Sequence, residues 1–227
     1  MSEMAEGECI EASGEQTAVA RAVIYRFLSR CFSHPDVELL TLFDSASLEE
    51  FLLSWRYLGL EASESMSKAI AWLASCLSRE HALLELQKEY THLFITGYPK
   101  VVAPPYSSIY LDKARLVWGK STAEVAKLYE AAGLGMSENL HDIPDHIAAE
   151  LEFASYLIVE RQGQLESDPA NARKLLSIEY RFLTEHLSKW APAFFSRVAE
   201  CSRLPFYSDM ARLAQKFIGV DASHAAV

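Results

Sequence analysis

Two pairs of residues with the spacing Glu-x-x-His are the part of the sequence whose types and spacing would suit metal chemistry. They are Glu89 with His92 and Glu138 with His141. In four-helix bundles, a glutamate and a histidine three residues apart on one helix point toward a shared di-iron centre. The second pair stands shortly before Pro144, where we do not expect a helix, so its side chains would not project together. A helical-bundle metal enzyme is therefore the alternative hypothesis, and we predict no bound metal.

A carboxylate and an imidazole also occur close together at Asp145, His146 and Glu150. Side chains one helical turn apart can share a proton, so these residues would suit acid/base catalysis. An acidic residue at a helix N-terminus, with a histidine paired to Glu150, is also a common capping and surface arrangement. We favour the capping interpretation and keep an acid/base enzyme within the alternative.

Composition and charge exclude several other classes of function. The chain has a formal net charge of −10 at pH 7 and no visible cluster of lysine and arginine, so a basic peptide is a better partner than nucleic acid. No apolar run approaches the roughly 20 residues that cross a bilayer, and the acidic N-terminus lacks the apolar region of a signal peptide. We expect a cytoplasmic protein without stable membrane insertion. The cysteines show no CxxC spacing and no glycine-rich phosphate loop is recognisable, so we predict neither a disulfide framework nor a cofactor.

Capping motifs and apolar residues at steps of three and four predict helices along most of the chain. A first helix begins near Ser13 and ends before Pro35, with an apolar face formed by Ala20, Ile24, Phe27, Leu28 and Cys31. Further helices are predicted over residues 36–43, 47–59, 63–79, 83–96, 121–133, 145–163, 168–187, 190–203 and 206–217. No segment alternates as a strand would, so the fold class is all-α, a single irregular bundle of roughly ten helices. We expect residues 1–12 to form a disordered acidic tail, residues 13–219 the domain and residues 220–227 a C-terminal tail.

A proline-rich connection interrupts the helices in the middle of the chain. Pro104 and Pro105 forbid helix and favour an extended backbone, and aromatic residues follow them. A loose linker would be polar, so a connection with apolar residues of its own is either a buried connection or functional. Beyond it, Pro144 in a first turn and Asp145 near the positive end of a helix predict a strong helix start.

An ordered series of short motifs resembles the TorD/DmsD family, which is related to the NarJ group. The motifs are Glu89-Tyr90-x-x-Leu93-Phe94 with Gly97, Pro104-Pro105-Tyr106 followed by Tyr110-Leu111-Asp112, Trp118-Gly119, and Pro144-Asp145-His146-Ile147 with Glu150-Leu151-Glu152-Phe153. Each motif alone is short, but together they cover about a third of the chain in a consistent order.

The resemblance implies a chaperone without enzymatic activity. Members of this family bind the twin-arginine signal peptide of a molybdopterin-containing oxidoreductase and hold the apo form of its catalytic subunit until the cofactor is inserted, before export. Relatives occur as monomers and as domain-swapped dimers, and residues 96–111 would be the hinge of such a swap. Relatives often carry tryptophan in place of Tyr90, and in place of Tyr106 or Tyr110, which leaves the identity of the client open.

A twin-arginine signal joins a cationic segment to an apolar stretch, and this chain has acidic groups beside aromatic and aliphatic ones. We expect Asp145 and Glu150 to contact the cations, with His146 orienting Asp145 or contacting peptide backbone. We assign Tyr90, Leu93, Phe94, Tyr106 and Tyr110 to the apolar stretch, and we expect Tyr90, Phe94 and Tyr106 to form a groove outside the sealed core. By resemblance, the predicted site also includes Trp118, Gly119 and Pro144. Core packing is the competing interpretation of the aromatic residues, and for Leu93 it is the one we favour.

Overall fold

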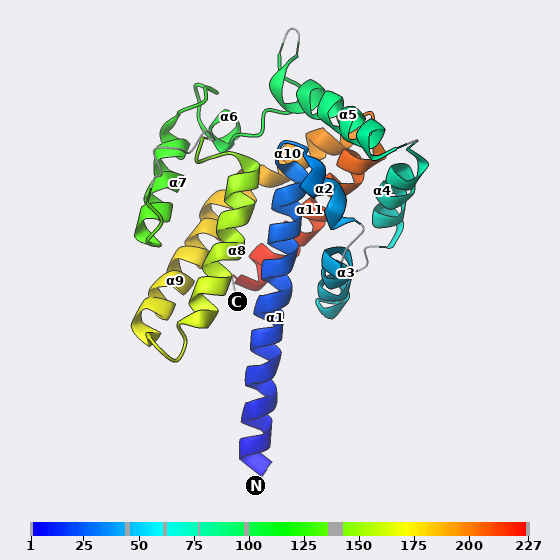
Figure 1. Ribbon diagram of the computed structural model, residues 1–227. Helices are drawn as coiled ribbons and strands as arrows, with labels where there is room; N and C mark the ends of the chain where they lie inside the picture. Colours follow the sequence, from blue (N-terminus) through cyan, green and yellow to red (C-terminus); the bar gives the residue numbers. More distant parts are fainter. Residues whose placement is uncertain are drawn as a thin grey trace.

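The structure is a computed structural model, which describes the backbone of residues 2–43, 46–60, 63–76, 78–97, 100–135 and 143–225 (Figure 1). In chain order its elements are α1 (Ser2–Phe32), α2 (Val37–Leu42), α3 (Ala46–Tyr57), α4 (Ser63–Ser75), α5 (Arg79–Tyr90), η1 (Thr91–Ile95), α6 (Ser107–Leu111), α7 (Lys120–Ala131), α8 (Ile147–Gly163), α9 (Pro169–Arg181), η2 (Phe182–Leu187), α10 (Ser188–Cys201) and α11 (Pro205–Ala225). The segments η1 and η2 are π-helical turns. Within these ranges there is no strand, and the predicted all-α class is confirmed.

The long helix α1 lies at the centre of the bundle. In Figure 1, α8 packs against it on one side and α3 on the other, and α11 also contacts it. The apolar stripe predicted for this helix is at most 4% exposed, and its members are Ala20, Ile24, Phe27, Leu28 and Cys31. Because residues at steps of three and four share one face of a helix, this pattern alone was sufficient to predict which side of α1 is buried.

Two helices extend beyond their predicted limits. α1 begins at Ser2 rather than near Ser13, and α11 continues to Ala225, past residue 219. Asp221 in this last part of α11 is buried and forms an ion pair with Arg21 of α1. The division of the chain into two tails and a domain stays a prediction.

A predicted break near residue 188 does not occur, because α9, η2 and α10 follow one another directly from Pro169 to Cys201. One buried apolar stripe explains the continuity. Its members are Leu183, Leu187, Trp190 and Phe194, at steps of four, three and four across the end of η2.

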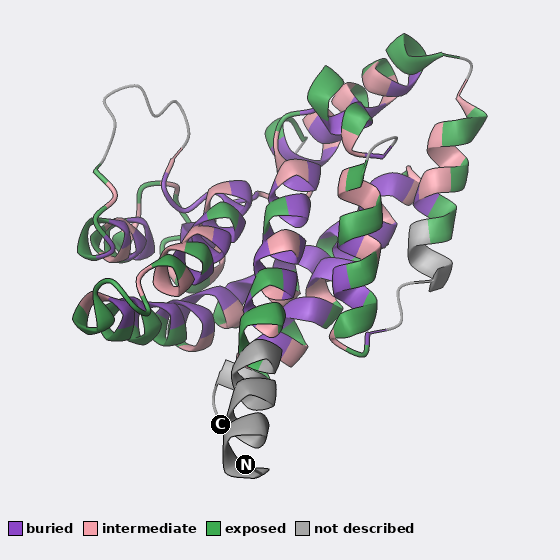
Figure 2. Ribbon diagram, turned by 60° about the horizontal axis from the view of Figure 1, so that its bottom comes forward, coloured by how far each residue is buried: buried purple, intermediate pink, exposed green. Residues whose placement is uncertain are grey.

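Large aromatic side chains fill the core, and the largest fully buried ones include Trp55, Trp190, Tyr25 and Tyr207. Figure 2 shows the buried residues on the helix faces that are turned toward the centre of the bundle. Burying a side chain of this size contributes about 1.5–3 kcal/mol to stability. Among the helices of the described ranges, none is both long and apolar enough to cross a membrane.

The proline-rich connection is docked on the bundle where it leaves η1. The N–H of Ala103 donates to the carbonyl of Leu93 at 2.8 Å, and the guanidinium of Arg197 donates to the carbonyl of Val102. Ala103 itself is fully buried. This part of the connection is therefore a buried one, while the hinge over residues 96–111 stays a prediction.

Candidate functional site

The proline-rich connection meets the start of α8 in a short strand-like contact. An isolated antiparallel bridge joins Tyr106 to His146, and the N–H of Ile147 donates to the carbonyl of Pro105 at 2.8 Å. Paired prolines favour an extended backbone, and their carbonyls remain available as acceptors. Two of the sequence motifs are thereby joined, although about 40 residues separate them in the chain.

The carboxylate of Asp145 is fully buried at the point where α6 begins. Its Oδ2 accepts the N–H of Ser108 at 2.9 Å and lies 3.4 Å from the hydroxyl of Ser107, whose N–H donates to the carbonyl of Asp145 at 3.0 Å. Asp145 therefore satisfies N–H groups that the first turn of α6 leaves without an internal partner. We favoured a capping role for Asp145, and the structure assigns that role to α6 rather than to the helix that follows in the chain.

The second carboxylate oxygen of Asp145, Oδ1, is buried and has no hydrogen-bond partner among the described residues. Leaving a buried acceptor without a donor is costly, and more so when the acceptor is charged. A donor brought to this oxygen from outside would therefore be stabilising.

His146 is the N-cap of α8, which begins at Ile147 rather than at Asp145 as predicted. The Nδ1 atom of His146 accepts the N–H of Ala148 at 3.2 Å, and its ring stands edge-on to the ring of Tyr106, with 5.3 Å between centroids. Pro144 lies just before this cap and is buried. Its carbonyl accepts the hydroxyl of Tyr129 from α7 at 2.8 Å, which ties α7 to the start of α8.

Glu150 is fully buried, so the expectation that it lies at the surface is wrong. The Nε2 atom of His186 in η2 lies 2.7 Å from its Oε1, and the indole N–H of Trp190 in α10 donates to its Oε2 at 2.9 Å. The suggested pairing of Glu150 with His146 does not form, because His146 caps the helix while Glu150 faces the bundle interior.

Burial and charge shift the titration of this buried pair. Burial raises the pKa of Glu150 above its ordinary value, although His186 and Trp190 act in the opposite direction. Burial alone would lower the pKa of His186, but the carboxylate of Glu150 outweighs it and the pKa is raised. The pair therefore retains a proton to higher pH than the two groups would in water.

Sequence reasoning missed His186 and Trp190 as partners of Glu150. The available signal was that His186 stands beside Leu187 within a buried helical stripe, where a polar side chain needs a hydrogen-bond partner. Which residue supplies that partner depends on how α8 packs against η2. A single sequence does not contain that packing.

The end of α5 and the π turn η1 carry three of the residues assigned to the apolar stretch of the peptide, and all three are buried. The exposed fractions are 6% for Tyr90, 0% for Leu93 and 5% for Phe94. The ring centroid of Phe94 lies 5.9 Å from that of Phe194 in α10 and 5.7 Å from that of Tyr207 in α11. The prediction of an exposed groove at these residues was wrong, because aromatic rings from the last two helices cover them. Core packing, which we favoured for Leu93, holds for all three.

Glu89, a member of the first Glu-x-x-His pair, is committed to a structural contact. It accepts the N–H of Arg203 at 2.6 Å and the hydroxyl of Ser202 at 3.0 Å, and so fixes the turn between α10 and α11. The second pair, Glu138 and His141, lies outside the described residues. Within the described ranges, no group of three His, Cys, Asp or Glu side chains is placed to hold a metal ion.

Asp112 and Gly119 fix the connection between α6 and α7. The carboxylate of Asp112 accepts the hydroxyl of Ser121 at 2.6 Å and its N–H at 3.2 Å, at the start of α7. A Cβ atom at position 119 would overlap this carboxylate, so Gly119 is required by the close approach. In the Trp118-Gly119 motif, Gly119 therefore has a structural role, whereas the side chain of Trp118 is exposed.

Leu111, Leu116 and Trp118, which we call the apolar loop, are exposed, and Trp118 is the one of them that belongs to the predicted site. Their exposed fractions are 36%, 66% and 67%. The backbone of Trp118 has φ +65° and that of Arg115 has φ +51°, in the left-handed region that is unfavourable for large side chains. Strained backbone that holds an apolar side chain in solvent is a recurring property of binding sites.

Tyr106 and Tyr110, which flank the start and the end of α6, are half-buried. The ring of Tyr110 packs on Trp190, with 5.5 Å between centroids, and its hydroxyl is buried without a hydrogen-bond partner among the described residues. Tyr106 thus lies beside the segment of Asp145 and His146. Tyr110 and Phe94 both pack on the ring of Phe194, but Phe94 is buried there together with Tyr90 and Leu93.

Comparison with known proteins places these motifs in a wider context. The family described as nitrate reductase delta subunit matches residues 60–196. The chaperone protein TorD of Aliivibrio salmonicida is 31% identical over 91% of this chain and 94% of its own. The protein of the same name from Vibrio cholerae is 32% identical over 88% of this chain and 90% of its own.

A solved structure is also similar. It is a redox enzyme maturation protein from Archaeoglobus fulgidus, which superposes with a TM-score of 0.55 at 26% identity and covers 87% of this chain and 93% of its own.

Proposed function

This chain belongs to the nitrate reductase delta subunit family, the group that its motifs resemble, and we propose that it is a cytoplasmic chaperone for a molybdopterin-containing oxidoreductase. In this role it binds the twin-arginine signal peptide of the client and holds the apo catalytic subunit until the cofactor is inserted, before export. Relatives named as chaperones and a similar redox enzyme maturation protein support this role.

The observation that carries the proposal is the exposure of the apolar loop. Leu116 and Trp118 are both about two-thirds exposed, on a short connection fixed at both ends by Asp112. A rigid, exposed tryptophan is the kind of side chain that contributes most to peptide binding. We assign the apolar stretch of the signal peptide to this loop, with Tyr106 and Tyr110 as its inner wall.

The cationic segment requires an acceptor nearby, and Asp145 supplies one. Its free Oδ1 is suited to a guanidinium, which donates in a fork to carboxylates. Ser107 and Ser108 of α6 bond the other oxygen, Oδ2, and Asp145 is fully buried beneath the start of this helix, so α6 must shift for an arginine to reach Oδ1. α6 is only five residues long, and a shift of so short an element disturbs few contacts.

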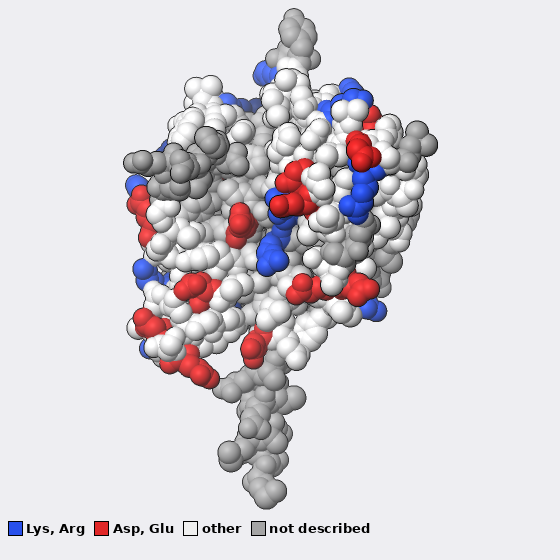
Figure 3. Space-filling view, in the orientation of Figure 1, with Lys and Arg blue, Asp and Glu red and all other residues white. Residues whose placement is uncertain are grey.

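Among the described residues, the face seen in Figure 3 has no concentrated group of acidic side chains that could bind the cationic segment in place of Asp145. There, acidic and basic side chains are scattered between wide uncharged areas. A specific contact with one arginine therefore depends on a local acceptor, rather than on a broad acidic surface. We assign Glu150 to the fold, because His186 and Trp190 already occupy its two oxygens.

Fluorescence anisotropy with a synthetic signal peptide tests the proposal. The probe is a labelled twin-arginine signal peptide from a molybdopterin-containing oxidoreductase of the same cell. We expect saturable binding that weakens at least about tenfold when both arginines are replaced by glutamine, and that weakens with added salt. Equal binding of the two peptides at low salt would remove the signal-peptide role.

Affinity capture from the native cytosol, followed by mass spectrometry, identifies the client. We expect the catalytic subunit of a molybdoenzyme among the captured proteins.

The metal-enzyme alternative is tested by elemental analysis of protein purified without chelator. One or two equivalents of iron or zinc would favour that alternative, and we expect none.

A further inference from the structure

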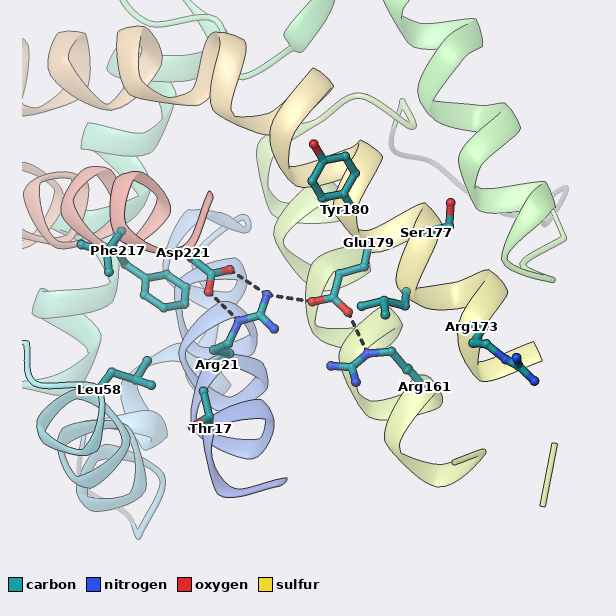
Figure 4. A pocket seen from close by; sticks show the side chains of 12 residues that line it. Thr17, Arg21, Leu58, Arg161, Arg173, Ser177, Glu179, Tyr180, Phe217 and Asp221 are labelled. Carbon is teal, nitrogen blue, oxygen red and sulfur yellow. Dashed lines mark hydrogen bonds and ion pairs between the residues drawn. The ribbon is translucent and has the colours of Figure 1, made fainter. Parts of the chain in front are cut away.

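A cavity is lined by residues of α1, α8, α9 and α11. Its volume is about 560 Å³, within the range of small-molecule sites. Figure 4 shows that side chains from four helices and from the end of α3 converge on it. None of the sequence motifs described above contributes to this cavity.

Two arginines and two carboxylates form the polar wall of the cavity. Arg21 pairs with both oxygens of Asp221, and its Nη2 lies 2.7 Å from Glu179. Arg161 donates to the other oxygen of Glu179 at 3.0 Å. The hydroxyl of Tyr25 also donates to Asp221, at 2.8 Å, so all four carboxylate oxygens have a donor.

The two arginines, in contrast, have donors to spare. Among the described residues, Nη1 of Arg21 and both terminal nitrogens of Arg161 have no hydrogen-bond partner, and Figure 4 shows the guanidinium of Arg21 beside the shared carboxylate of Glu179 and that of Arg161 below it. The carboxylates of Glu179 and Asp221 are 4% and 3% exposed, whereas Arg21 and Arg161 are 14% and 15% exposed. The accessible polar surface is therefore made of donors, with the acceptors saturated and buried behind them.

The remaining lining is largely apolar or cationic. Leu58, Leu176 and Phe217 supply apolar walls, and Arg173 adds a third guanidinium at the rim. The exposed carboxylates of Glu15 and Glu166 line only the adjoining cavity. Charges of this kind are well screened by solvent, so they weaken the attraction for an anion without cancelling it.

We propose that this cavity binds a small organic anion, with one carboxylate, sulfonate or phosphate group held by the free N–H groups of Arg21 and Arg161 and an apolar body against Leu176 and Phe217. A guanidinium recognises such groups through paired hydrogen bonds, and the largely buried position of Arg21 and Arg161 strengthens them. Since the anion contacts α1, α8 and α9 together, its binding also stabilises the bundle.

Isothermal titration calorimetry of the full chain with naphthalene-1-sulfonate tests this site. The neutral naphthalene-1-sulfonamide has the same ring and serves as the matched probe. We expect one sulfonate per chain and a sulfonamide affinity at least about tenfold lower. Equal affinities, or no saturable binding of the sulfonate, would overturn the proposal.

Matched variants on α9 locate the binding. Arg173→Gln and Lys174→Gln each remove one exposed positive charge, but only Arg173 lines the cavity. We expect Arg173→Gln to weaken sulfonate binding about threefold and Lys174→Gln to leave it unchanged. Equal effects of the two substitutions would mean that the sulfonate responds only to net charge, which would contradict the site.

A second pair of variants tests the rim without disturbing the buried ion pairs. Leu176 is 49% exposed, so Leu176→Glu and Leu176→Gln are both expected to fold. We expect the glutamate variant to bind the sulfonate at least about tenfold more weakly than the glutamine variant, because it places a like charge beside the anion. Trp118→Ala controls for binding to the apolar loop and should leave sulfonate affinity unchanged. Sulfonate affinity that depends on Trp118 rather than on Leu176 would overturn the assignment.

Discussion

The π turn η1 and the apolar loop both include residues of the family motifs and both carry large apolar side chains, yet their environments are opposite. Leu93 and Phe94 in η1 are at most 5% exposed, whereas Leu116 and Trp118 in the loop are about two-thirds exposed. Membership of a motif therefore indicates that a residue matters for the fold or for binding, but it does not distinguish the two. Burial makes that distinction.

The difference follows from how each segment is held. η1 continues the apolar stripe of α5, with Leu86, Tyr90 and Leu93 at steps of four and three, so it must face the core. The apolar loop has no helical period, and its backbone at Trp118 is held in the left-handed region. No neighbouring helix covers it in the described part of the chain.

The largest expected effect on stability comes from Phe94→Ala. The ring packs against Phe194 and Tyr207, so its removal leaves a cavity and should lower the free energy of unfolding by about 3–5 kcal/mol. Urea unfolding measures this loss. Peptide affinity of the folded fraction should stay unchanged, and a weakened affinity with little loss of stability would return Phe94 to the binding surface.

A smaller loss is expected for Glu150→Gln. The amide oxygen can still accept the N–H of Trp190, but the neutral amide loses the charge-assisted contact with a protonated His186, which should cost about 1–3 kcal/mol. We expect thermal unfolding at a lower temperature than the parent and an unchanged peptide affinity. If the variant unfolds as the parent does but binds peptide more weakly, Glu150 belongs to the site after all.

The Glu150–His186 pair also predicts how stability depends on pH. The pKa of each group is raised in the folded protein, so the folded state binds more protons than the unfolded chain. The stabilisation from His186 is then present below its unfolded pKa, about 6.5, and is lost as the pH rises through the folded pKa. Urea unfolding as a function of pH should show this decrease, and His186→Gln should flatten it. Stability that rises above pH 7 would contradict the assignment.

Gly119→Ala should lower the free energy of unfolding by about 1 kcal/mol, because a Cβ there displaces the Asp112 carboxylate from the start of α7. It also loosens the apolar loop, so peptide affinity should fall together with stability. Ser121→Ala removes one bond of the same cap without adding a Cβ at position 119, and serves as the control. An unchanged peptide affinity in Gly119→Ala would mean that peptide binding does not depend on the geometry of the apolar loop.

Sequence reasoning succeeded where a periodic pattern was sufficient and failed where the outcome depended on packing. The stripe of Ile24 and Phe27 in α1 was predicted correctly because helical geometry alone decides which residues share a face. The partner of Glu150 was missed, because His186 is far along the chain and meets it only through the contact between α8 and η2. Asp145 was recognised as a capping residue, but the helix that it caps depends on where the proline-rich connection docks.

The most direct test of the central claim is the signal-peptide affinity of Trp118→Ala, measured by isothermal titration calorimetry. Val159→Ala, which truncates a 59%-exposed side chain on α8, is the matched control. We expect Trp118→Ala to lose at least about tenfold in affinity with a change in unfolding free energy within about 0.5 kcal/mol, and Val159→Ala to change neither. A Trp118→Ala protein that binds the peptide as tightly as the parent would contradict the assignment of the signal peptide to the apolar loop.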